Sequence, residues 1–216
     1  MTRRVLIVSL LATVAGCLIL RDANAGERAY QDVNGQIAIV EGAPTLAPFQ
    51  HVRFCLKYPS DCKSNPAEIE RIELKAETLE LLRRVNTSVN VAIAPELKGY
   101  GPELKDSWKI APVSGDCNDY ANTKRHNLLE SGLPSKALRL SVVKTSSGIG
   151  HLVLVVATTK GDLVLDNLTD SIHPWQSTDY RWLKIQSAAD ARFWYDIRPP
   201  ARIAQSGRHV RLADRQ

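Results

Sequence analysis

Residues 151–158 constrain the fold of this chain more than any other stretch. They are almost all apolar and many are β-branched, which is typical of a strand that a sheet buries on both faces. Residues 159–162 are turn-forming and the apolar residues 163–168 follow, so the chain is expected to return antiparallel. Further strands of the same sheet are predicted at residues 138–143, 180–186 and 193–197. The C-terminal half is therefore expected to form an antiparallel sheet.

Helical patterns precede these strands. Residues 65–86 repeat apolar side chains at helical spacing, with Pro66 in the expected first turn. A second helix is expected to begin after Asp116 and to end at Gly132, because Asp is a good N-cap and Gly a good C-terminal stop. The chain thus has its helices before its antiparallel strands, which predicts the α+β class.

The N-terminus has the parts of a secretory signal peptide. Arg3 and Arg4 are followed by an uncharged apolar run and by an A-x-A cleavage signal at 23–25. We therefore predict that residues 1–25 are removed on export and that the mature protein is periplasmic or secreted. The sequence Val-Ala-Gly-Cys, which ends at Cys17, resembles a lipobox, so a lipoprotein anchored at Cys17 is the alternative.

The rest of the chain is expected to be one domain with a short tail. Residues 26–198 are long enough for a domain with a real core. Residues 199–216 begin with two prolines and are basic, so we expect a poorly ordered tail. The formal net charge of the whole chain is only +5. In an exported protein this charge gives no reason to expect a nucleic-acid partner, and we expect a monomer.

The cysteines set one thiol apart from the others. Of the four in the chain, Cys17 lies in the signal peptide. Cys55 and Cys62 follow a predicted loop at 44–48 and flank turn-forming residues, so a local disulfide between them is expected in an oxidising compartment. Cys117 is then left as a free thiol in an exported protein. No second Cys or His lies at metal-ligand spacing from it.

This free thiol has the features of a nucleophile. Cys117 stands at a predicted helix start, where backbone N–H groups favour the thiolate. His151 opens the buried strand and Asp166 lies on the returning strand. Pairing Thr158 with Leu163 puts both side chains on one face but leaves them out of register, so the hairpin is expected to turn earlier. The three residues predict a nucleophile, its base and an orienting carboxylate.

Other titratable residues fit this arrangement less well. His126 lies further along the same predicted helix and is expected to point elsewhere. Ordinary surface positions in loops or in the tail are expected for His51, His173 and His209. Asp162 in the turn and Asp170 beyond the apolar run are alternative orienting residues. His151 and Asp166 are therefore the preferred partners of the thiol.

Several motifs follow one another along residues 54–197. They are Cys55 and Cys62, Trp108 and Pro112, Gly115-Asp116-Cys117 with Asp119-Tyr120-Ala121, Gly132-Leu133-Pro134, the strand 151–156, and Gly161 with 164–167. In this order they resemble the bacterial transglutaminase-like cysteine proteinases, the family that includes the periplasmic protease which releases biofilm adhesins. The resemblance implies a papain-like or transglutaminase-like core, in which the nucleophile-bearing helix packs on an antiparallel sheet. It also implies a triad of Cys117, His151 and Asp166.

The same resemblance implies an exported cysteine endopeptidase that cleaves a protein substrate, with a surface adhesin as a candidate. It further implies a regulatory membrane protein as a partner. The adhesin-releasing members resemble the chain at Asp116 but carry an acidic residue where Asn118 stands, and these side chains help to hold calcium. Asn118 lacks the charge, so we expect no required cofactor, with calcium at Asp116 and Asn118 as the candidate metal. Two alternatives stay open: an acyltransferase of transglutaminase type with the same triad, and a non-catalytic exported interaction domain.

Overall fold

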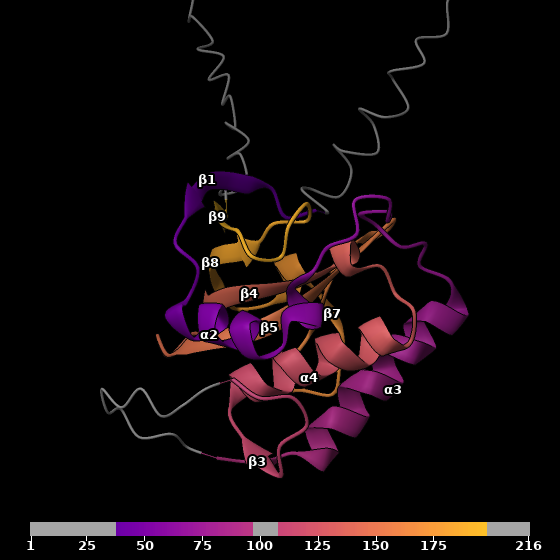
Figure 1. Ribbon diagram of the computed structural model, residues 1–216. Helices are drawn as coiled ribbons and strands as arrows, with labels where there is room; N and C mark the ends of the chain where they lie inside the picture. The colour runs from indigo at the N-terminus through magenta and orange to yellow at the C-terminus, as the bar shows by residue number, and fades with distance from the viewer. Residues whose placement is uncertain (1–37, 97–107, 198–216) are drawn as a thin grey trace, which may run out of the picture. The chain divides into compact units, whose positions relative to one another are not determined.

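The computed structural model describes residues 38–96 and 108–197 (Figure 1). The predicted signal peptide at 1–25, the lipobox that ends at Cys17 and the predicted tail at 199–216 lie outside the described residues. The described part holds a seven-stranded sheet, three α-helices and three short 3₁₀ helices. Among these helices, none is both long and apolar enough to cross a membrane.

The seven-stranded sheet has the strand order β1-β9-β8-β4-β5-β6-β7. Its strands are β1 Glu41–Thr45, β4 Leu138–Lys144, β5 Gly150–Thr158, β6 Gly161–Leu165, β7 His173–Pro174, β8 Arg181–Gln186 and β9 Trp194–Ile197. Every neighbouring pair runs antiparallel. Strand β5 lies inside the sheet and is buried at every position after Gly150. The strand predicted at 151–158 is therefore confirmed.

The α-helices share a core with one face of this sheet. They are α2 Phe49–Lys57, α3 Ala76–Ala92 and α4 Cys117–Glu130. The 3₁₀ helices are η1 Pro59–Cys62, η2 Ser135–Ala137 and η3 Trp175–Ser177. A separate two-stranded parallel sheet pairs β2 Ala94–Pro95 with β3 Ser114–Gly115. Helix α4 packs on β5, and α3 packs on α4 (Figure 1). Leu152 and Leu154 share the helix-side core, whereas Val153 and Val155 pack with Trp175 on the other face. The α+β class, with the Cys117 helix packed on an antiparallel sheet, is confirmed.

The β5–β6 hairpin brings His151 and Asp166 to the same face of the sheet. Thr158 pairs with Gly161, which leaves a two-residue turn between the strands. Gly161 has a φ of 109°, a backbone conformation that favours glycine. The hairpin thus turns earlier than a Thr158–Leu163 pairing would require, as expected. If this register is continued past the end of β6, Asp166 lies opposite Val153. Val153 is two residues from His151 in β5, so the side chains of His151 and Asp166 are on the same face of the sheet.

The helix predicted at 65–86 is wrong in its first half. Helix α3 begins only at Ala76, after turns and extended chain. Ile72 exchanges two backbone hydrogen bonds of 2.9 Å with the β5–β6 hairpin. The Glu68 carboxylate accepts hydrogen bonds of 2.6 Å from the backbone and the hydroxyl of Ser135. These contacts hold the segment along the sheet, and they outweigh its local helical pattern.

The predicted loop at 44–48 is followed by a helix that the sequence pattern did not predict. Helix α2 begins after Pro48 and buries His51 and Phe54. The surface position predicted for His51 is wrong, because its side chain is only 1 % exposed. Its ring packs against Trp108 and Trp194, with centroids 5.8 and 5.3 Å apart. Contacts between distant segments, and not a local pattern, thus account for the burial of α2.

Candidate active site

Cys117 is the first residue of α4, and its neighbours fix the start of that helix. Asp116 is the N-cap, and its carboxylate accepts a hydrogen bond of 3.0 Å from the backbone N–H of Asn118. Asp119 completes a capping box by accepting from the backbone N–H of Asp116 at 3.2 Å. A Cβ atom on Gly115 would lie 2.5 Å from the Asp119 carboxylate, so a side chain there would clash. The local sequence therefore places the thiol at the positive end of the helix dipole.

The Cys117 thiol and the His151 side chain line the same cleft. Cys117 is half-buried and is the free cysteine of the described residues. Cys117 is also among the groups that raise the pKa of His151. A cleft of about 360 Å³ opens onto both residues, and Phe49, Gln50 and Trp108 are among its walls. The thiol and the imidazole are thus reachable from one side.

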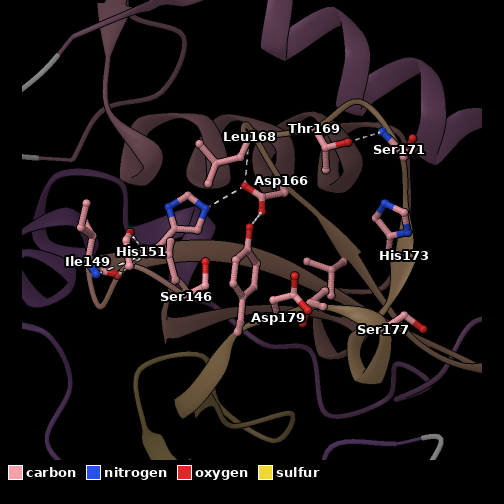
Figure 2. A pocket seen from close by; sticks show the side chains of 15 residues that line it. Ser146, Ile149, His151, Asp166, Leu168, Thr169, Ser171, His173, Ser177 and Asp179 are labelled. Atoms are coloured by element: carbon pink, nitrogen blue, oxygen red, sulfur yellow. Dashed lines mark hydrogen bonds and ion pairs between the residues drawn. The ribbon is translucent and has the colours of Figure 1, made fainter.

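The His151 ring is held from its other nitrogen by Asp166. The two atoms His151 Nε2 and Asp166 Oδ1 are 2.7 Å apart (Figure 2). This contact leaves Nδ1 for the thiol. Both side chains are buried, with Asp166 3 % and His151 7 % exposed. The Asp166 carboxylate also accepts a hydrogen bond of 3.1 Å from the backbone N–H of Leu168 and one from the Tyr180 hydroxyl.

These contacts change the proton affinity of both partners. Burial alone lowers the pKa of His151, but hydrogen bonds to Asp166 and Cys117, together with their negative charge, raise this pKa to about 9. Burial raises the pKa of Asp166, yet the hydrogen bond and the charge of His151 outweigh burial and lower it overall. The pair therefore favours an imidazolium beside a carboxylate at neutral pH.

Tyr180 is the residue of this site that the sequence did not reveal. Its hydroxyl donates to Asp166 Oδ2. Its ring meets the His151 ring edge-on, with centroids 5.7 Å apart and an interplanar angle of 63°. The sequence marks Tyr180 only as the beginning of a strand, and no local signal links a tyrosine to a carboxylate on another strand.

The alternative orienting aspartates lie in other contacts. Asp162 is fully buried and accepts hydrogen bonds from Arg71 at 2.5 Å and from Arg139 at 3.3 Å. It therefore ties β6 to neighbouring segments as part of the core. Asp170 accepts a hydrogen bond of 2.8 Å from the Asn90 side chain of α3. Neither aspartate has a hydrogen bond to His151 among those described.

The remaining histidines also lie apart from the thiol. The ring of His126 is 3.0 Å from the carboxylate of Asp61, so it points away from Cys117 as expected. His173 is exposed on β7, in agreement with its predicted surface position. His209 lies outside the described residues. His151 is the histidine that the described structure brings to Cys117.

The predicted calcium ligands are engaged in holding the helix start. Asp116 Oδ1 accepts from the backbone of Asn118, and Oδ2 accepts from its side-chain amide at 3.1 Å. As placed, these groups do not offer the six to eight oxygen ligands that calcium takes, so calcium at Asp116 and Asn118 stays a prediction. Among described residues, close metal-ligating atoms are found at His51, Cys55 and Cys62. The two sulfurs of that group are joined to each other and cannot serve as thiolate ligands.

The structure contains the disulfide between Cys55 and Cys62. It joins the last turns of α2 to η1, with the two Cα atoms 5.5 Å apart. The ring of His51 lies against it, with Nε2 3.3 Å from the Cys55 sulfur. The disulfide and the Cys117 thiol are therefore separate features, and they line different hollows of the described structure.

Comparison with known proteins gives the family. Among solved structures, the chain is similar to Legionella pneumophila LapG in a calcium-bound form (25 % identity, TM-score 0.48, 60 % of this chain and 75 % of that chain). Two further LapG structures are each 22 % identical with a TM-score of 0.45. The match covers 66 % of this chain and 77 % of the first of them. For the second, which is EGTA-treated, it covers 65 % of this chain and 75 % of that chain. No curated protein sequence matches the chain. The model of one family, described as bacterial transglutaminase-like cysteine proteinase, matches residues 41–202, which is well over half of the chain. The chain therefore belongs to the bacterial transglutaminase-like cysteine proteinases and is a cysteine peptidase.

Proposed function

We propose that this peptidase is an exported endopeptidase whose catalytic triad is Cys117, His151 and Asp166. The observation that carries the proposal is the buried His151–Asp166 hydrogen bond of 2.7 Å, whose histidine lines the same cleft as the free Cys117 thiol. The thiol stands at a helix N-terminus that favours the thiolate, and the carboxylate holds the ring in one orientation. A thiol that served only for packing would not need a buried histidine–aspartate pair beside it.

The proposed triad implies a mechanism through a thioester. His151 takes the proton of Cys117, and the thiolate attacks the carbonyl carbon of the substrate peptide bond. The imidazolium then donates this proton to the leaving amine, which leaves the acyl group on the sulfur. His151 next takes a proton from water as the water oxygen attacks the thioester carbon. The C–S bond then breaks, the acid is released, and the imidazolium returns the proton to the sulfur. Asp166 fixes the imidazole tautomer and stabilises the imidazolium in both half-reactions.

We assign two donors to the developing oxyanion. The first is the backbone N–H of Cys117, which lies at the start of α4. The second is the side-chain amide of Gln50, which lines the same cleft as the thiol. Gln50→Ala is expected to slow acylation by about 10²-fold, because one oxyanion donor is lost. Single-turnover acylation by an activated ester measures this rate, and an unchanged rate would remove Gln50 from the mechanism.

The natural substrate is proposed from the family. We propose an exported surface protein, such as an adhesin, as the substrate and a regulatory membrane protein as a partner of a monomeric enzyme. We also propose that the mature protein is periplasmic or secreted. Mass spectrometry of the exported protein tests this location. A chain that begins at Gly26 is expected, whereas a lipid-modified Cys17 would establish the lipoprotein alternative.

We further propose that activity needs no bound metal. Asp116 already binds Asn118 with both carboxylate oxygens, and Asn118 adds no charge for a cation. The rate of acylation is expected to be the same after treatment with EGTA and after addition of calcium. A loss of activity in EGTA that calcium restores would overturn this proposal and would assign a calcium site.

Product analysis separates the peptidase from its alternatives. A thiol-directed peptide inhibitor is expected to label Cys117, and cleavage in H₂¹⁸O is expected to place ¹⁸O in the new carboxyl terminus. Transfer of the acyl group to an added amine, in place of hydrolysis, would show a transglutaminase-type acyltransferase. A Cys117→Ala strain with an intact phenotype, together with no labelling of the wild type, would show a non-catalytic interaction domain.

A further inference from the structure

The Asp166 carboxylate is held at both of its oxygens. Oδ1 accepts from His151 Nε2 at 2.7 Å and from the backbone N–H of Leu168 at 3.1 Å. Oδ2 accepts from the Tyr180 hydroxyl. A carboxylate held at one oxygen alone can rotate about its last side-chain bond, whereas donors on both oxygens fix its plane. The orientation of Asp166 toward His151 thus depends on groups outside the proposed triad.

Tyr180 contacts both members of the buried pair. Its hydroxyl binds Asp166, and its ring lies edge-on to the His151 ring, with centroids 5.7 Å apart. It forms part of the wall of a hollow of about 550 Å³ that opens onto His151 and Asp166 (Figure 2). Cys117 does not line this hollow but lines the separate cleft beside Phe49 and Trp108. Tyr180 therefore contacts the pair from a hollow that Cys117 does not line.

Several charged or titratable groups face this pair from the surrounding elements. Cys117 of α4 meets His151, and the buried Lys124 of the same helix interacts with the charges of Asp166 and Asp170. Asp179 lies next to Tyr180 in the chain and acts on it with its charge. Burial, and after it the hydrogen bond to Asp166, raises the pKa of Tyr180, so its hydroxyl remains a donor across the working pH range.

We propose that Tyr180 is a positioning residue of the peptidase. Its hydroxyl holds the Asp166 carboxylate in the orientation in which this carboxylate accepts the hydrogen bond from His151 Nε2. The Tyr180 ring limits the rotation of the imidazole. This inference rests on the proposed triad, because Tyr180 touches neither the thiol nor the cleft that would take the substrate. Without the hydroxyl, Asp166 stabilises the imidazolium less well, and proton transfer from Cys117 becomes less favourable.

The test compares Tyr180→Phe with Tyr195→Phe. Phenylalanine keeps the ring beside His151 and removes only the hydroxyl. Tyr195 lies on β9, the strand next to β8 in the sheet. Tyr195→Phe removes a tyrosine hydroxyl there and serves as the matched control. Tyr180→Phe is expected to slow acylation by an activated ester about tenfold, and Tyr195→Phe to leave the rate unchanged. Folding of each variant is checked by circular dichroism, and all rates are measured in a chelator and again with calcium.

A pH titration shows whether Tyr180 acts through Asp166 and His151. The NMR signal of the His151 Cε1–H group follows its protonation directly. In Tyr180→Phe its midpoint is expected to fall by about half a pH unit or more, because Asp166 loses the donor that fixes its plane and then stabilises the imidazolium less well. The same substitution made in an Asp166→Asn background is expected to have no further effect on the rate. A tenfold loss that persists in that background would overturn the proposal.

The failure of this inference is distinct from the failure of the proposed function. If His151→Ala slows acylation in the same series while Tyr180→Phe matches the wild type in rate and titration midpoint, Tyr180 has no positioning role and the triad stands. If His151→Ala itself leaves the rate unchanged, the triad fails and the role of Tyr180 fails with it. A Tyr180→Phe variant that does not fold is replaced by Tyr180→Leu, which has no group to donate to Asp166 and for which the same loss of rate and lowered midpoint are expected.

Discussion

His51 and His151 lie in two regions of the protein and are both hidden from solvent, with residue exposures of 1 and 7 %. His51 lies on α2 beside the disulfide, and burial lowers its pKa to about 4 despite a hydrogen bond from its ring to the Ala191 carbonyl. His151 lies on β5 beside Cys117, and its pKa is raised to about 9. Burial lowers the pKa at both positions, so the hydrogen-bonding and charged partners decide whether the pKa ends below or above its ordinary value.

The comparison separates a structural histidine from a candidate catalytic one. Among the described residues, no carboxylate is hydrogen-bonded to His51, whose ring packs against aromatic residues and the Cys55 sulfur. His151 has a carboxylate at one ring nitrogen and shares its cleft with the Cys117 thiol. A base needs a partner that stabilises its protonated form, and only the second region supplies one. Burial and proximity to a sulfur atom are therefore not enough to identify a base.

The largest expected difference is in reactivity. His151→Gln is expected to slow the release of p-nitrophenol from p-nitrophenyl acetate by about 10²- to 10³-fold, because the general base is lost. His51→Gln is expected to leave the rate per folded molecule close to that of the wild type. Stopped-flow absorbance measures both rates, and active sites are counted by labelling Cys117. An equal loss in the two variants would show that the comparison is wrong.

The second expected difference is in the pH dependence of stability. The pKa of His51 falls from 6.5 in the unfolded chain to about 4 in the folded protein. Between these values only the unfolded chain binds the proton, so the free energy of unfolding is expected to decrease by about 3 kcal/mol as pH falls from about 6.5 to about 4. The contribution of His151 has the opposite sign: it is complete below pH 6.5 and is lost as pH rises to about 9.

Urea unfolding of the wild type, His51→Gln and His151→Gln at several pH values measures these two contributions. His51→Gln is expected to flatten the acid side of the stability curve, and His151→Gln to flatten the alkaline side. Because both histidines are replaced by Gln, each variant is the control for the other. If His51→Gln leaves the acid side unchanged, His51 is not held neutral by burial, and the contrast between the two histidines is smaller than the structure indicates.

The smallest expected effect concerns the disulfide beside His51. Replacing Cys55 and Cys62 together by Ser is expected to lower the free energy of unfolding by about 2.5 kcal/mol, because the short cross-link restricts the unfolded chain. The acylation rate of Cys117 in the folded protein is expected to stay the same. Urea unfolding and ester hydrolysis of the double variant measure the two properties. A clear loss of acylation would show that α2 couples the disulfide to the active-site cleft.

The parts of the site that could be predicted from the sequence depend on local patterns. The start of α4 follows from Asp116 and Asp119 close to Cys117, since a capping box is made within one helical turn. The shared face of His151 and Asp166 follows from the period of two in a hairpin, which survives a change in register. The α+β class follows in the same way from the order of helical and strand patterns.

The parts that could not be predicted depend on contacts between distant segments. His51 is predicted on the surface because nothing near it in sequence shows the aromatic rings of Trp108 and Trp194 that bury it. Tyr180 reaches Asp166 only after β8 has been placed in the sheet. The chain before α3 is extended because Ile72 bonds to the β5–β6 hairpin, which its own helical pattern does not show.

The most direct test of the central claim is the pH dependence of alkylation of Cys117 by iodoacetamide, in the wild type and in His151→Ala. Peptide mass spectrometry assigns the label to Cys117. We expect rapid labelling below pH 7 in the wild type and loss of this labelling in the variant, because His151 supplies the cation that stabilises the thiolate. Slow labelling with a midpoint near the free-thiol value of about 8.5, unchanged by the substitution, would contradict the account and would leave Cys117 as a structural residue.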